Sequence, residues 1–542
     1  MKVENIRIEK YRSIEDVSLS MPKDAPLILF GPNNAGKSNI LSAIDRILGE
    51  RWPVNIEMTD SDYFMRDSAR YPCSAITATF DDDIYQSKYG SSNTIGVEYW
   101  CPGYTGEESR LFQGGGEKTY GFGNSQRARC RSYLIQANRN IDSALSYGNR
   151  YSLLSNFTHA IHTFLAKEKK EELDAVFQGI KTTFESLPQY RDFVKSIQEM
   201  VQDSVKGFTH SLEVDLSAYD PNNYANALRV VAVEGGEIRS FEEFGTGEQQ
   251  ILLMAFAQAY LKVFGQGEGL VLIIEEPEAH LHPLAQRWLK KHIYDICRDG
   301  LQVILSTHSP DFLDPRNLEG LVRVYKEDGV TRICQITAAD LVRFCIETGV
   351  PENRISEASV NDFYASKVNT AQLRGMFAER VLFVEGATEA LALPVYFSKH
   401  AFWLAAEGIE VVECGGKEAI PLFWRLYEAL GFACYCLFDA DGKQEDYDRH
   451  FKGLFGDVVL DTAADSFTCK EHFAYFGVNW EKYFETSVEG YAESKDSLYQ
   501  DMLIDTSSKQ ALAYAYAVQA ERAPHFTYEL IDALRCLRCR GK

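Results

Sequence analysis

Short hydrophobic runs that end in charged or small polar residues recur along the chain. Leu27–Phe30, Gly269–Ile274 and the run LQVILST at 301–307 are each apolar enough to form a buried strand. Similar runs return later in the chain, at Val381–Val384 and at 433–438. Amphipathic stretches lie between these runs. Strands that alternate with helices predict a mixed α/β fold with parallel sheets.

The spacing of apolar residues becomes helical in the middle of the first half. From Tyr147 to Phe208 they recur every three or four positions, as in NFTHAIHTFLAKEKKEELDAVFQGI. This pattern predicts an inserted helical region that divides the first α/β domain in two. Such an insertion is a common means of dimer contact, although a lobe of the same domain would show the same pattern.

These patterns predict a division of the chain into domains. Residues 1–146 and 209–335 form two parts of one α/β domain, 147–208 the helical insertion, 336–376 a linker, and 377–542 a second α/β domain with C-terminal helices. No repeat or low-complexity tract interrupts this order.

Composition narrows the class of protein. The 542 residues are 45% hydrophobic, which is enough for a core in each domain. No apolar run reaches the roughly 20 residues needed to cross a bilayer, and the N-terminus lacks the features of a signal peptide, so we expect a cytoplasmic protein with reduced cysteines. The net charge of −22 argues against a passive nucleic-acid coat but does not exclude DNA binding through a local basic groove.

The stretch LILFGPNNAGKSN joins an apolar strand to an amphipathic helix through a glycine-bounded loop. It contains the pattern GxxxxGK[ST], whose backbone N–H groups and helix N-terminus bind phosphate oxygens. We expect Lys37 to reach the terminal phosphates of ATP and the Ser38 hydroxyl to hold Mg²⁺. The predicted nucleotide contacts are Gly31, Asn33, Asn34, Gly36, Lys37, Ser38 and Asn39.

Two later strands end in residues suited to ATP hydrolysis. GLVLIIEEPEAHLHP ends its strand with Glu275 and Glu276, and paired carboxylates there are costly unless they serve a metal or a proton transfer. We assign Glu275 to Mg²⁺ and Glu276 to polarising the attacking water. His308, after the next strand, would touch the γ-phosphate or orient Glu276. A glutamine that senses the nucleotide is either Gln136 or Gln86.

The segment FEEFGTGEQQ precedes a long apolar helix and offers a second anion-binding surface. The order GPNNAGKS, GTGEQ, IIEEPEAHLHP, STHSP resembles that of ABC-type ATPase heads. This resemblance implies that Thr246, Gly247 and Gln249 belong to a signature loop, which completes the nucleotide site of an opposite protomer. Glu248 and Glu275 depart from the commonest residues in that class, so we expect slow hydrolysis.

A second acidic site follows in the C-terminal domain. Glu385 ends the strand RVLFV, Glu389 lies one helical turn on, the strand of IEVVECGGK follows, and ACYCLFDADGK ends in Asp439 and Asp441. The alternate spacing of the two aspartates in an extended segment would place both on one side. Because parallel strands end at one edge, we expect the four carboxylates in one crevice, which only divalent cations would hold together. Hard oxygen ligands select Mg²⁺, Mn²⁺ or Ca²⁺ over zinc.

The ordered set of strand-EGxxE, strand-GGK and strand-DADG resembles the Toprim domain. An ABC-type ATPase followed by a Toprim domain is similar to the OLD (overcoming lysogenization defect) family of nucleases. The resemblance implies metal ligands at Glu385, Glu389, Asp439 and Asp441, with a further acidic residue and a lysine that we place at Glu481 and Lys509. Lys509 would stabilise charge on the transferred phosphate, although an exposed lysine without a role is equally consistent with the sequence.

The OLD resemblance implies a metal-dependent DNA endonuclease that nicks or cleaves, acts in antiphage defence, and assembles as a homodimer or homotetramer through the ATPase and the insertion. Its ATPase would regulate assembly or access to DNA. A helicase or a reverse transcriptase with its own DNA would have to be a separate chain. The alternatives are a DNA-tethering ATPase whose Toprim part does not cut, and a strand-passing enzyme, for which no tyrosine stands in a recognisable breakage domain.

Overall fold

The computed structural model describes residues 2–49, 58–82, 269–279, 281–501 and 508–537, with shorter stretches between 86 and 136 and between 161 and 259. The chain divides into two compact units. One comprises residues 1–137 and 268–542, and the other residues 138–267.

The second unit is described through one helix and one hairpin. Helix α5 (Lys170–Ser186) lies within the predicted helical insertion and is helical as the spacing of its apolar residues predicts. Strands β11 (Ala232–Glu234) and β12 (Glu237–Arg239) pair antiparallel. The predicted dimerising role of the insertion remains a prediction.

A large sheet runs through the N-terminal part of the first unit. Its described strands have the order β10-β13-β14-β3-β15-β16-β2-β1-β4-β7-β8-β9. The parallel neighbours are β10 (Cys130–Ile135), β13 (Gly269–Glu275), β14 (Gln302–Thr307), β3 (Leu27–Phe30) and β15 (Leu321–Glu327). Since β3, β13 and β14 are parallel, the residues that follow them meet at one edge of the sheet.

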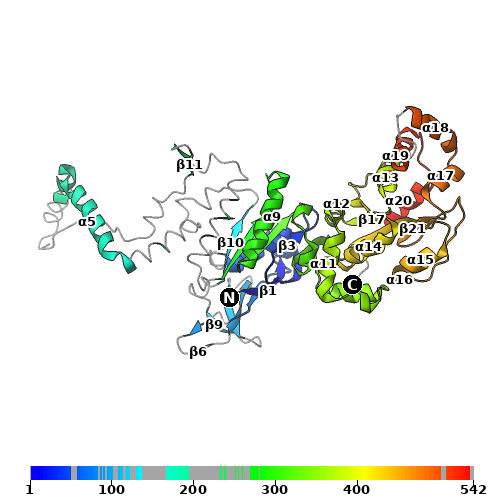
Figure 1. The fold of residues 1–542 in the computed structure, drawn as a ribbon. Helices are drawn as coiled ribbons and strands as arrows, with labels where there is room; N and C mark the ends of the chain where they lie inside the picture. Colours follow the sequence, from blue (N-terminus) through cyan, green and yellow to red (C-terminus); the bar gives the residue numbers. More distant parts are fainter. Residues whose placement is uncertain are drawn as a thin grey trace. The chain divides into compact units, whose positions relative to one another are not determined.

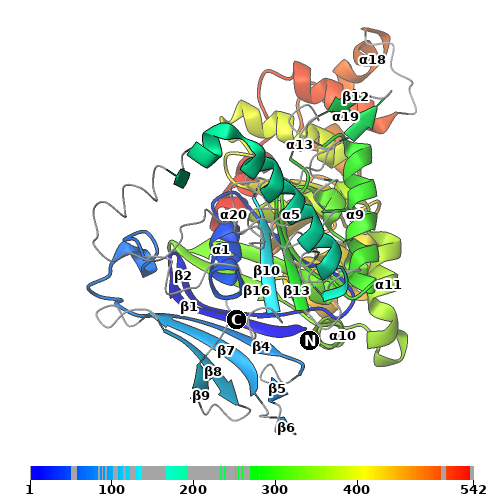
Figure 2. The same cartoon turned by 90° about the vertical axis from the view of Figure 1, so that its left-hand side faces the viewer.

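The rest of the large sheet is mostly antiparallel. Its strands are β16 (Val330–Gln335), β2 (Ile14–Ser20), β1 (Val3–Tyr11), β4 (Ser74–Phe80), β7 (Thr94–Cys101), β8 (Glu108–Gln113) and β9 (Lys118–Gly121). Only the β16–β2 neighbours in this part pair parallel, whereas the strands from β2 to β9 form an antiparallel series, which Figure 2 shows beside helix α1.

Two helices next to this sheet follow phosphate-binding or acidic segments. Helix α1 (Lys37–Leu48) begins at the lysine of the GxxxxGK[ST] loop and buries Ile40 and Ile44 against the sheet. Helix α9 (Pro283–Arg298) follows β13 and buries Leu289 and Ile293. Both helices are therefore fixed by an apolar face, which anchors the loops at their N-terminal ends.

The C-terminal part of the first unit contains a smaller sheet of order β18-β17-β19-β21-β20. Its strands are β18 (Ile409–Glu413), β17 (Arg380–Val384), β19 (Ala433–Asp439), β21 (Phe473–Phe476) and β20 (Phe467–Cys469). All neighbours pair parallel except β20 with β21. The ends of β17, β18 and β19 therefore meet at one edge, as the sequence predicts.

Helices cover both faces of this smaller sheet (Figure 1). Leu382 and Val384 of β17 share a core cluster with residues of α13 (Ala387–Lys399). Phe383, which points to the other face, packs edge-on against Tyr427 of α14 (Ile420–Ala429), with ring centroids 5.2 Å apart. Alternate residues of the same strand thus pack against different helices, as expected for a buried parallel strand.

Helices α15 (Gln444–His450) and α16 (Lys452–Phe455) follow β19. Four further helices follow β21: α17 (Trp480–Ser487), α18 (Tyr491–Asp501), α19 (Lys509–Gln519) and α20 (Phe526–Cys536). They join the core on the α13 side through buried residues such as Trp480, Phe484 and Phe526. Helix α17 begins directly beside the end of β19, which brings its N-terminus to the acidic edge of the sheet.

The residues 336–376, interpreted above as a linker, are helical and packed. They form α10 (Ala338–Glu347), α11 (Glu357–Lys367) and α12 (Thr370–Arg374). Residues of α10 contact α14, and those of α11 contact the short helix at Pro315–Gly320. Residues of α12 also contact β18, so this segment packs against the smaller sheet and against a short helix that contacts β3 and β15 of the large sheet.

Two findings concern the described residues as a whole. Their cysteines are free thiols, as predicted. None of their helices combines the length and the apolar character needed to span a membrane.

Candidate active sites

The phosphate-binding loop after β3 has a backbone that only glycine tolerates at two positions. Gly31 has a φ of 139° and Gly36 a φ of 112°. A Cβ at Gly31 would lie 2.1 Å from the Val324 carbonyl oxygen, and one at Gly36 would lie 2.1 Å from Thr331 Oγ1. The two glycines of the pattern are therefore required by close packing against β15 and β16.

Lys37 lies under this loop. Its Nζ donates hydrogen bonds to the carbonyl oxygens of Gly31 and Pro32, both at 2.9 Å. The residue is 6% exposed, and burial lowers the pKa of Lys37 to about 8, an effect that the nearby Glu276 and Glu278 oppose. The ammonium group is thus held ready at the centre of the loop, where a terminal phosphate would replace carbonyl partners.

The proposed Mg²⁺ ligands of the nucleotide site lie together. Ser38, at the start of α1, donates a hydrogen bond from Oγ to Glu275 Oε1 at the end of β13. The neighbouring Asn39 donates from Nδ2 to Ser13 Oγ at 2.8 Å, which fixes the first turn of α1 to the β1–β2 turn. Two oxygen donors from segments far apart in sequence therefore face one position, as a magnesium site requires.

Glu276 and His308 also lie together. His308 Nε2 is 3.6 Å from Glu276 Oε1, and burial, followed by the charge of Lys37, lowers the pKa of His308. Glu276 has a φ of 47°, a left-handed conformation that is uncommon for a residue other than glycine. Strained backbones of this kind cluster at functional sites.

Sequence reasoning missed Glu278. Its carboxylate accepts hydrogen bonds from Thr307 Oγ1, at 2.9 Å, and from the backbone N–H of His308, so it joins the end of β14 to the loop after β13. Burial raises the pKa of Glu278. The available signal was a third carboxylate two residues after Glu276, in a segment where the strand has already ended.

Some of the other predicted nucleotide-binding residues lie within the part of the chain that the structure describes, and some lie outside it. Asn34 Oδ1 accepts a hydrogen bond from Lys326 Nζ at 3.3 Å, and Asn33 and Asn34 line a cavity of about 550 Å³. The predicted signature-loop residues Thr246, Gly247 and Gln249 lie outside the described residues.

Glu385 follows β17 and points across the sheet edge to β19. Its Oε1 accepts a hydrogen bond of 2.7 Å from the backbone N–H of Asp439. Burial raises the pKa of Glu385 to about 7, and the charges of Glu389 and Asp441 act in the same direction. Glu385, which follows β17, and Asp439 of β19 are therefore neighbours, as the sequence predicts.

Glu389 lies in the first turn of α13 and is 6% exposed. Its Oε2 accepts a hydrogen bond of 3.1 Å from the backbone N–H of Gly386, so it caps the helix as well as joining the acidic edge. Burial raises the pKa of Glu389 to about 7, and Glu481 and Glu413 add to the increase. A buried carboxylate of this kind is costly to ionise without a nearby cation.

Asp439 and Asp441 do not lie in one extended segment, contrary to the sequence interpretation. Asp439 ends the strand, and its Oδ1 accepts a hydrogen bond of 3.1 Å from the backbone N–H of Trp480. Asp441 has a φ of 53° and lies in a turn, where its carboxylate pairs with Lys417. Strand β19 ends at Asp439, two residues before Asp441, because the chain turns at Asp441–Gly442, where both residues have positive φ.

Glu481 and Lys509 approach each other, with Lys509 Nζ 3.2 Å from Glu481 Oε1. The charge of Glu481 contributes to raising the pKa values of Glu389 and Asp439, so Glu481 belongs to the same electrostatic cluster. Burial is the main reason that the pKa of Asp439 lies well above its ordinary value. The structure thus brings Glu481 and Lys509 to the acidic edge.

The donor set of this edge fits a hard divalent cation. Oxygen ligands are what Mg²⁺, Mn²⁺ and Ca²⁺ take. Burial, with repulsion from neighbouring carboxylates added to it, raises the pKa values of Glu385, Glu389 and Asp439. Within the described residues, however, no three acidic, histidine or cysteine side chains are arranged to hold an ion. Asp439 is turned to α17 and Asp441 to Lys417, which accounts for this difference.

Comparison with known families agrees with the two halves of the chain. The family described as "AAA ATPase domain" matches residues 1–100 and 122–313. The family described as "Overcoming lysogenization defect protein-like, TOPRIM domain" matches residues 376–441, which include Glu385, Glu389, Asp439 and Asp441. The first domain implies ATP as a ligand, and the second implies a divalent metal.

Three curated proteins are similar to the chain. An "OLD nuclease" of Thermus scotoductus is 28% identical over 460 residues, covering 81% of this chain and 82% of that protein. "Endonuclease GajA" of Bacillus cereus is 23% identical over 420 residues, covering 72% of this chain and 67% of that protein. "Old nuclease" of Escherichia phage P2 is 26% identical over 210 residues, covering 38% of this chain and 34% of that protein.

Proposed function

Because the chain belongs to the OLD family, with an AAA ATPase domain followed by an OLD-like Toprim nuclease domain, we propose that it is an ATP-binding, metal-dependent DNA endonuclease. One observation carries this proposal. The ends of β17 and β19 and the start of α13 bring Glu385, Glu389 and Asp439 together, each with a raised pKa. Such a cluster is stable in its ionised form only beside cations.

The residues of the Toprim edge have distinct proposed roles. Bound divalent ions would stabilise the attacking and leaving oxygens of a phosphodiester displacement. The ions would be held by Glu385, Glu389, Asp439, Asp441 and Glu481. Lys509, whose side chain is 70% exposed beside Glu481, would place a positive charge against the phosphate of the DNA strand.

The ATPase site would work through residues of two copies of the chain. Lys37 and the loop N–H groups would hold the phosphates, Ser38 and Glu275 the Mg²⁺, and Glu276 the attacking water, with His308 orienting Glu276. Thr246, Gly247 and Gln249 would complete the site from a partner copy. The protein would therefore hydrolyse ATP slowly as a homodimer or homotetramer, with the helical insertion 147–208 adding contacts.

The ATPase would control assembly of the nuclease or its access to DNA. A described contact between the two sheets supports this regulation. Arg323 of β15 is 2% exposed and donates a hydrogen bond from Nη1 to the Gly431 carbonyl oxygen. Its guanidinium lies 3.7 Å from the centroid of the Phe432 ring, directly before β19. Cys334 of β16 adds a hydrogen bond to the Ala429 carbonyl oxygen at 3.6 Å.

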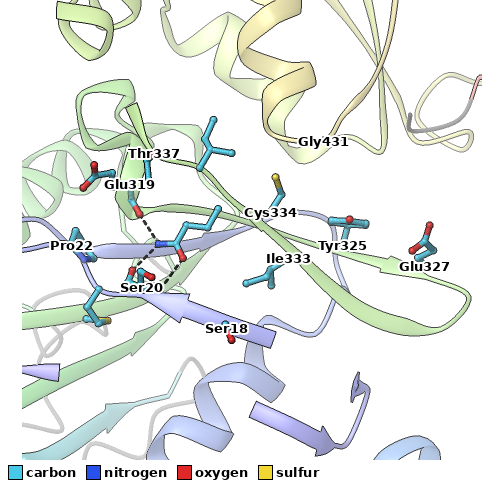
Figure 3. Close-up of a pocket in the computed structure, with 13 residues that line it drawn as sticks. Ser18, Ser20, Pro22, Glu319, Tyr325, Glu327, Ile333, Cys334, Thr337 and Gly431 are labelled. Carbon is cyan, nitrogen blue, oxygen red and sulfur yellow. Dashed lines mark hydrogen bonds between the residues drawn. The ribbon is translucent and has the colours of Figure 1, made fainter. Parts of the chain in front are cut away.

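The phosphate-binding loop lines a cavity together with Arg323 of the same contact. The cavity of about 550 Å³ is lined by Asn33 and Asn34 of the loop and by Glu379 and Ala433 of the smaller sheet. A second cavity, of about 600 Å³, is lined by residues of β2, by the β15–β16 hairpin and by Gly431 (Figure 3). A change in the loop on nucleotide binding would thus reach β19, which ends in Asp439.

The wider role belongs to the same proposal. The proposed division of the chain is an ATPase in 1–146 and 209–335, the insertion, the packed segment 336–376 and the nuclease in 377–542. We propose that the protein acts in the cytoplasm in antiphage defence, on DNA as substrate, with a helicase or reverse transcriptase as a separate partner chain where one is needed. The alternative is a DNA-tethering ATPase whose Toprim domain binds DNA without cutting it.

Plasmid nicking separates these functions. Purified full-length protein is incubated with supercoiled plasmid and Mg²⁺, Mn²⁺ or Ca²⁺, with and without ATP, and the same reactions are repeated with EDTA. We expect metal-dependent conversion to nicked or linear DNA that EDTA abolishes. A protein that retards plasmid in a gel but leaves it supercoiled under every metal and nucleotide condition would support tethering and refute the endonuclease proposal.

A further inference from the structure

The tripeptide Gly415–Gly416–Lys417, which follows β18, has no role in the proposed mechanism so far. Gly415 has a φ of 79° and Gly416 a φ of 133°, and a Cβ at either position would meet nothing within 4 Å. The glycines are therefore needed for backbone conformation rather than for space. The Gly416 N–H donates a hydrogen bond of 2.7 Å to the Glu385 carbonyl oxygen, which fixes the tripeptide to the acidic edge.

Lys417 extends from this fixed point to the turn after β19. Its side chain is 13% exposed. The Nζ donates hydrogen bonds to Asp441 Oδ2, to Asp446 Oδ2 at 3.0 Å, and to the Asp439 carbonyl oxygen at 3.4 Å. One ammonium group is thus shared between a proposed metal ligand, Asp441, and an aspartate of the next helix, α15 (Gln444–His450).

We propose that Lys417 is a latch that withholds Asp441 from the metal site until a divalent ion competes for it. This inference rests on the proposed function, which makes Asp441 a metal ligand. Metal binding would exchange the bond between Lys417 and Asp441 for one between Asp441 and the ion, while Asp446 keeps its bond to Lys417.

The latch sets how much metal the nuclease needs. Because Asp446 retains the ammonium group, release of Asp441 costs one partly exposed ion pair rather than a bare buried charge. Removing Lys417 should therefore strengthen metal binding by roughly fivefold, the factor that corresponds to about 1 kcal/mol. Removing Asp446 should weaken it, because Lys417 then has Asp441 as its remaining carboxylate partner among the contacts described.

The test measures Mn²⁺ binding directly, by calorimetric titration of the metal-free full-length protein without nucleotide. The signal of a Glu385→Ala variant is subtracted so that only the Toprim site is counted. Lys417→Met should bind Mn²⁺ about fivefold more tightly than the wild type, and Asp446→Asn about threefold more weakly. Lys417→Arg keeps the charge and the pairing, so its Mn²⁺ affinity should be close to that of the wild type. This variant shows whether a substitution at position 417 by itself disturbs the fold.

Two matched variants separate the latch from general electrostatics. Lys443→Met removes a positive charge from the same turn, and Glu445→Gln removes a negative charge from the residue before Asp446; both side chains are exposed. Each should leave Mn²⁺ binding within about twofold of the wild type. The proposal is overturned if Lys417→Met binds no more tightly than Lys443→Met, or if the wild type shows no Mn²⁺ binding that depends on Glu385.

Nicking then distinguishes failure of the latch from failure of the proposed function. Lys417→Met should reach its half-maximal nicking rate at a lower Mn²⁺ concentration than the wild type. If the wild type does not nick DNA but the calorimetric differences are present, the endonuclease proposal fails and the latch stands. If the wild type nicks DNA and the Mn²⁺ dependence of Lys417→Met is unchanged, the latch fails and the endonuclease stands.

Discussion

Glu389→Gln measures how much the ionised, buried Glu389 carboxylate lowers the free energy of unfolding when no metal is bound. The residue is 6% exposed, and burial raises its pKa from the ordinary value of 4.5 to about 7. Glutamine keeps the shape of the side chain and an oxygen that accepts the Gly386 N–H, but it carries no charge. The substitution therefore removes the ionisation while preserving the helix cap.

The size and sign of the effect follow from this pKa. Below the ordinary value of 4.5 the carboxyl group is protonated in the folded and the unfolded chain, so burial costs nothing. Between there and about 7 the folded chain keeps a proton that the unfolded chain loses, so the free energy of unfolding falls as pH rises. Above that range the full loss is present, on the order of 3 kcal/mol.

The assay is thermal unfolding of the full-length protein in EDTA, at about pH 5 and about pH 8. The transition of the Toprim domain is recognised by its upward shift when Mn²⁺ is added to the wild type. At the higher pH, Glu389→Gln should raise the midpoint of this transition by about 5–10 °C, with little effect at the lower pH. Glu489→Gln, at an exposed position, should change neither midpoint.

The same variant should lose most of the stabilisation that Mn²⁺ gives the wild type, because a proposed ligand has been removed. Equal midpoints for Glu389→Gln and the wild type at both pH values would refute the reasoning that burial makes this carboxylate costly. A gain of equal size at both pH values would also refute it, since packing rather than ionisation would then be the cause.

Three other substitutions test the ATPase and its link to the nuclease. Lys37→Ala should abolish ATP hydrolysis in a phosphate-release assay but retain some plasmid cutting; a variant inert in both assays would make hydrolysis obligatory for cutting. Gly36→Ala, whose Cβ would lie 2.1 Å from Thr331 Oγ1, should lower ATPase activity at least tenfold, whereas Gly179→Ala, with nothing within 4 Å, should not. Arg323→Ala should leave ATPase activity within about twofold of the wild type and reduce the effect of ATP on nicking; an unchanged ATP effect would exclude this contact as the link.

Many of the candidate site residues could be predicted because they lie at the ends of hydrophobic runs in the sequence. Glu275, His308, Glu385 and Asp439 each come at or just after the end of a buried strand, and parallel strands bring such ends to one edge. The glycine pattern of the phosphate-binding loop could also be predicted from the sequence, because few residues other than glycine adopt a φ like that of Gly36. These features depend on local sequence and on one rule of sheet geometry.

The features that escaped prediction depend on turns and on distant packing. The pairing of Lys417 with Asp441 joins two loops 24 residues apart, and no hydrophobic pattern in the sequence predicts it. Asp441 leaves the extended path because the chain turns at Asp441–Gly442. The segment 336–376 has polar helices, and its packed state comes from contacts such as Arg425 Nη2 to the Thr348 carbonyl oxygen, at 2.7 Å.

The central claim is that the Toprim carboxylates cut DNA, and Glu385 tests it most directly. Plasmid nicking in Mn²⁺ is compared for the wild type, Glu385→Ala and Glu521→Ala, the last being an exposed glutamate between α19 and α20. We predict that Glu385→Ala loses at least about a hundredfold in nicking rate while Glu521→Ala remains close to the wild type. Normal nicking by Glu385→Ala would contradict the account.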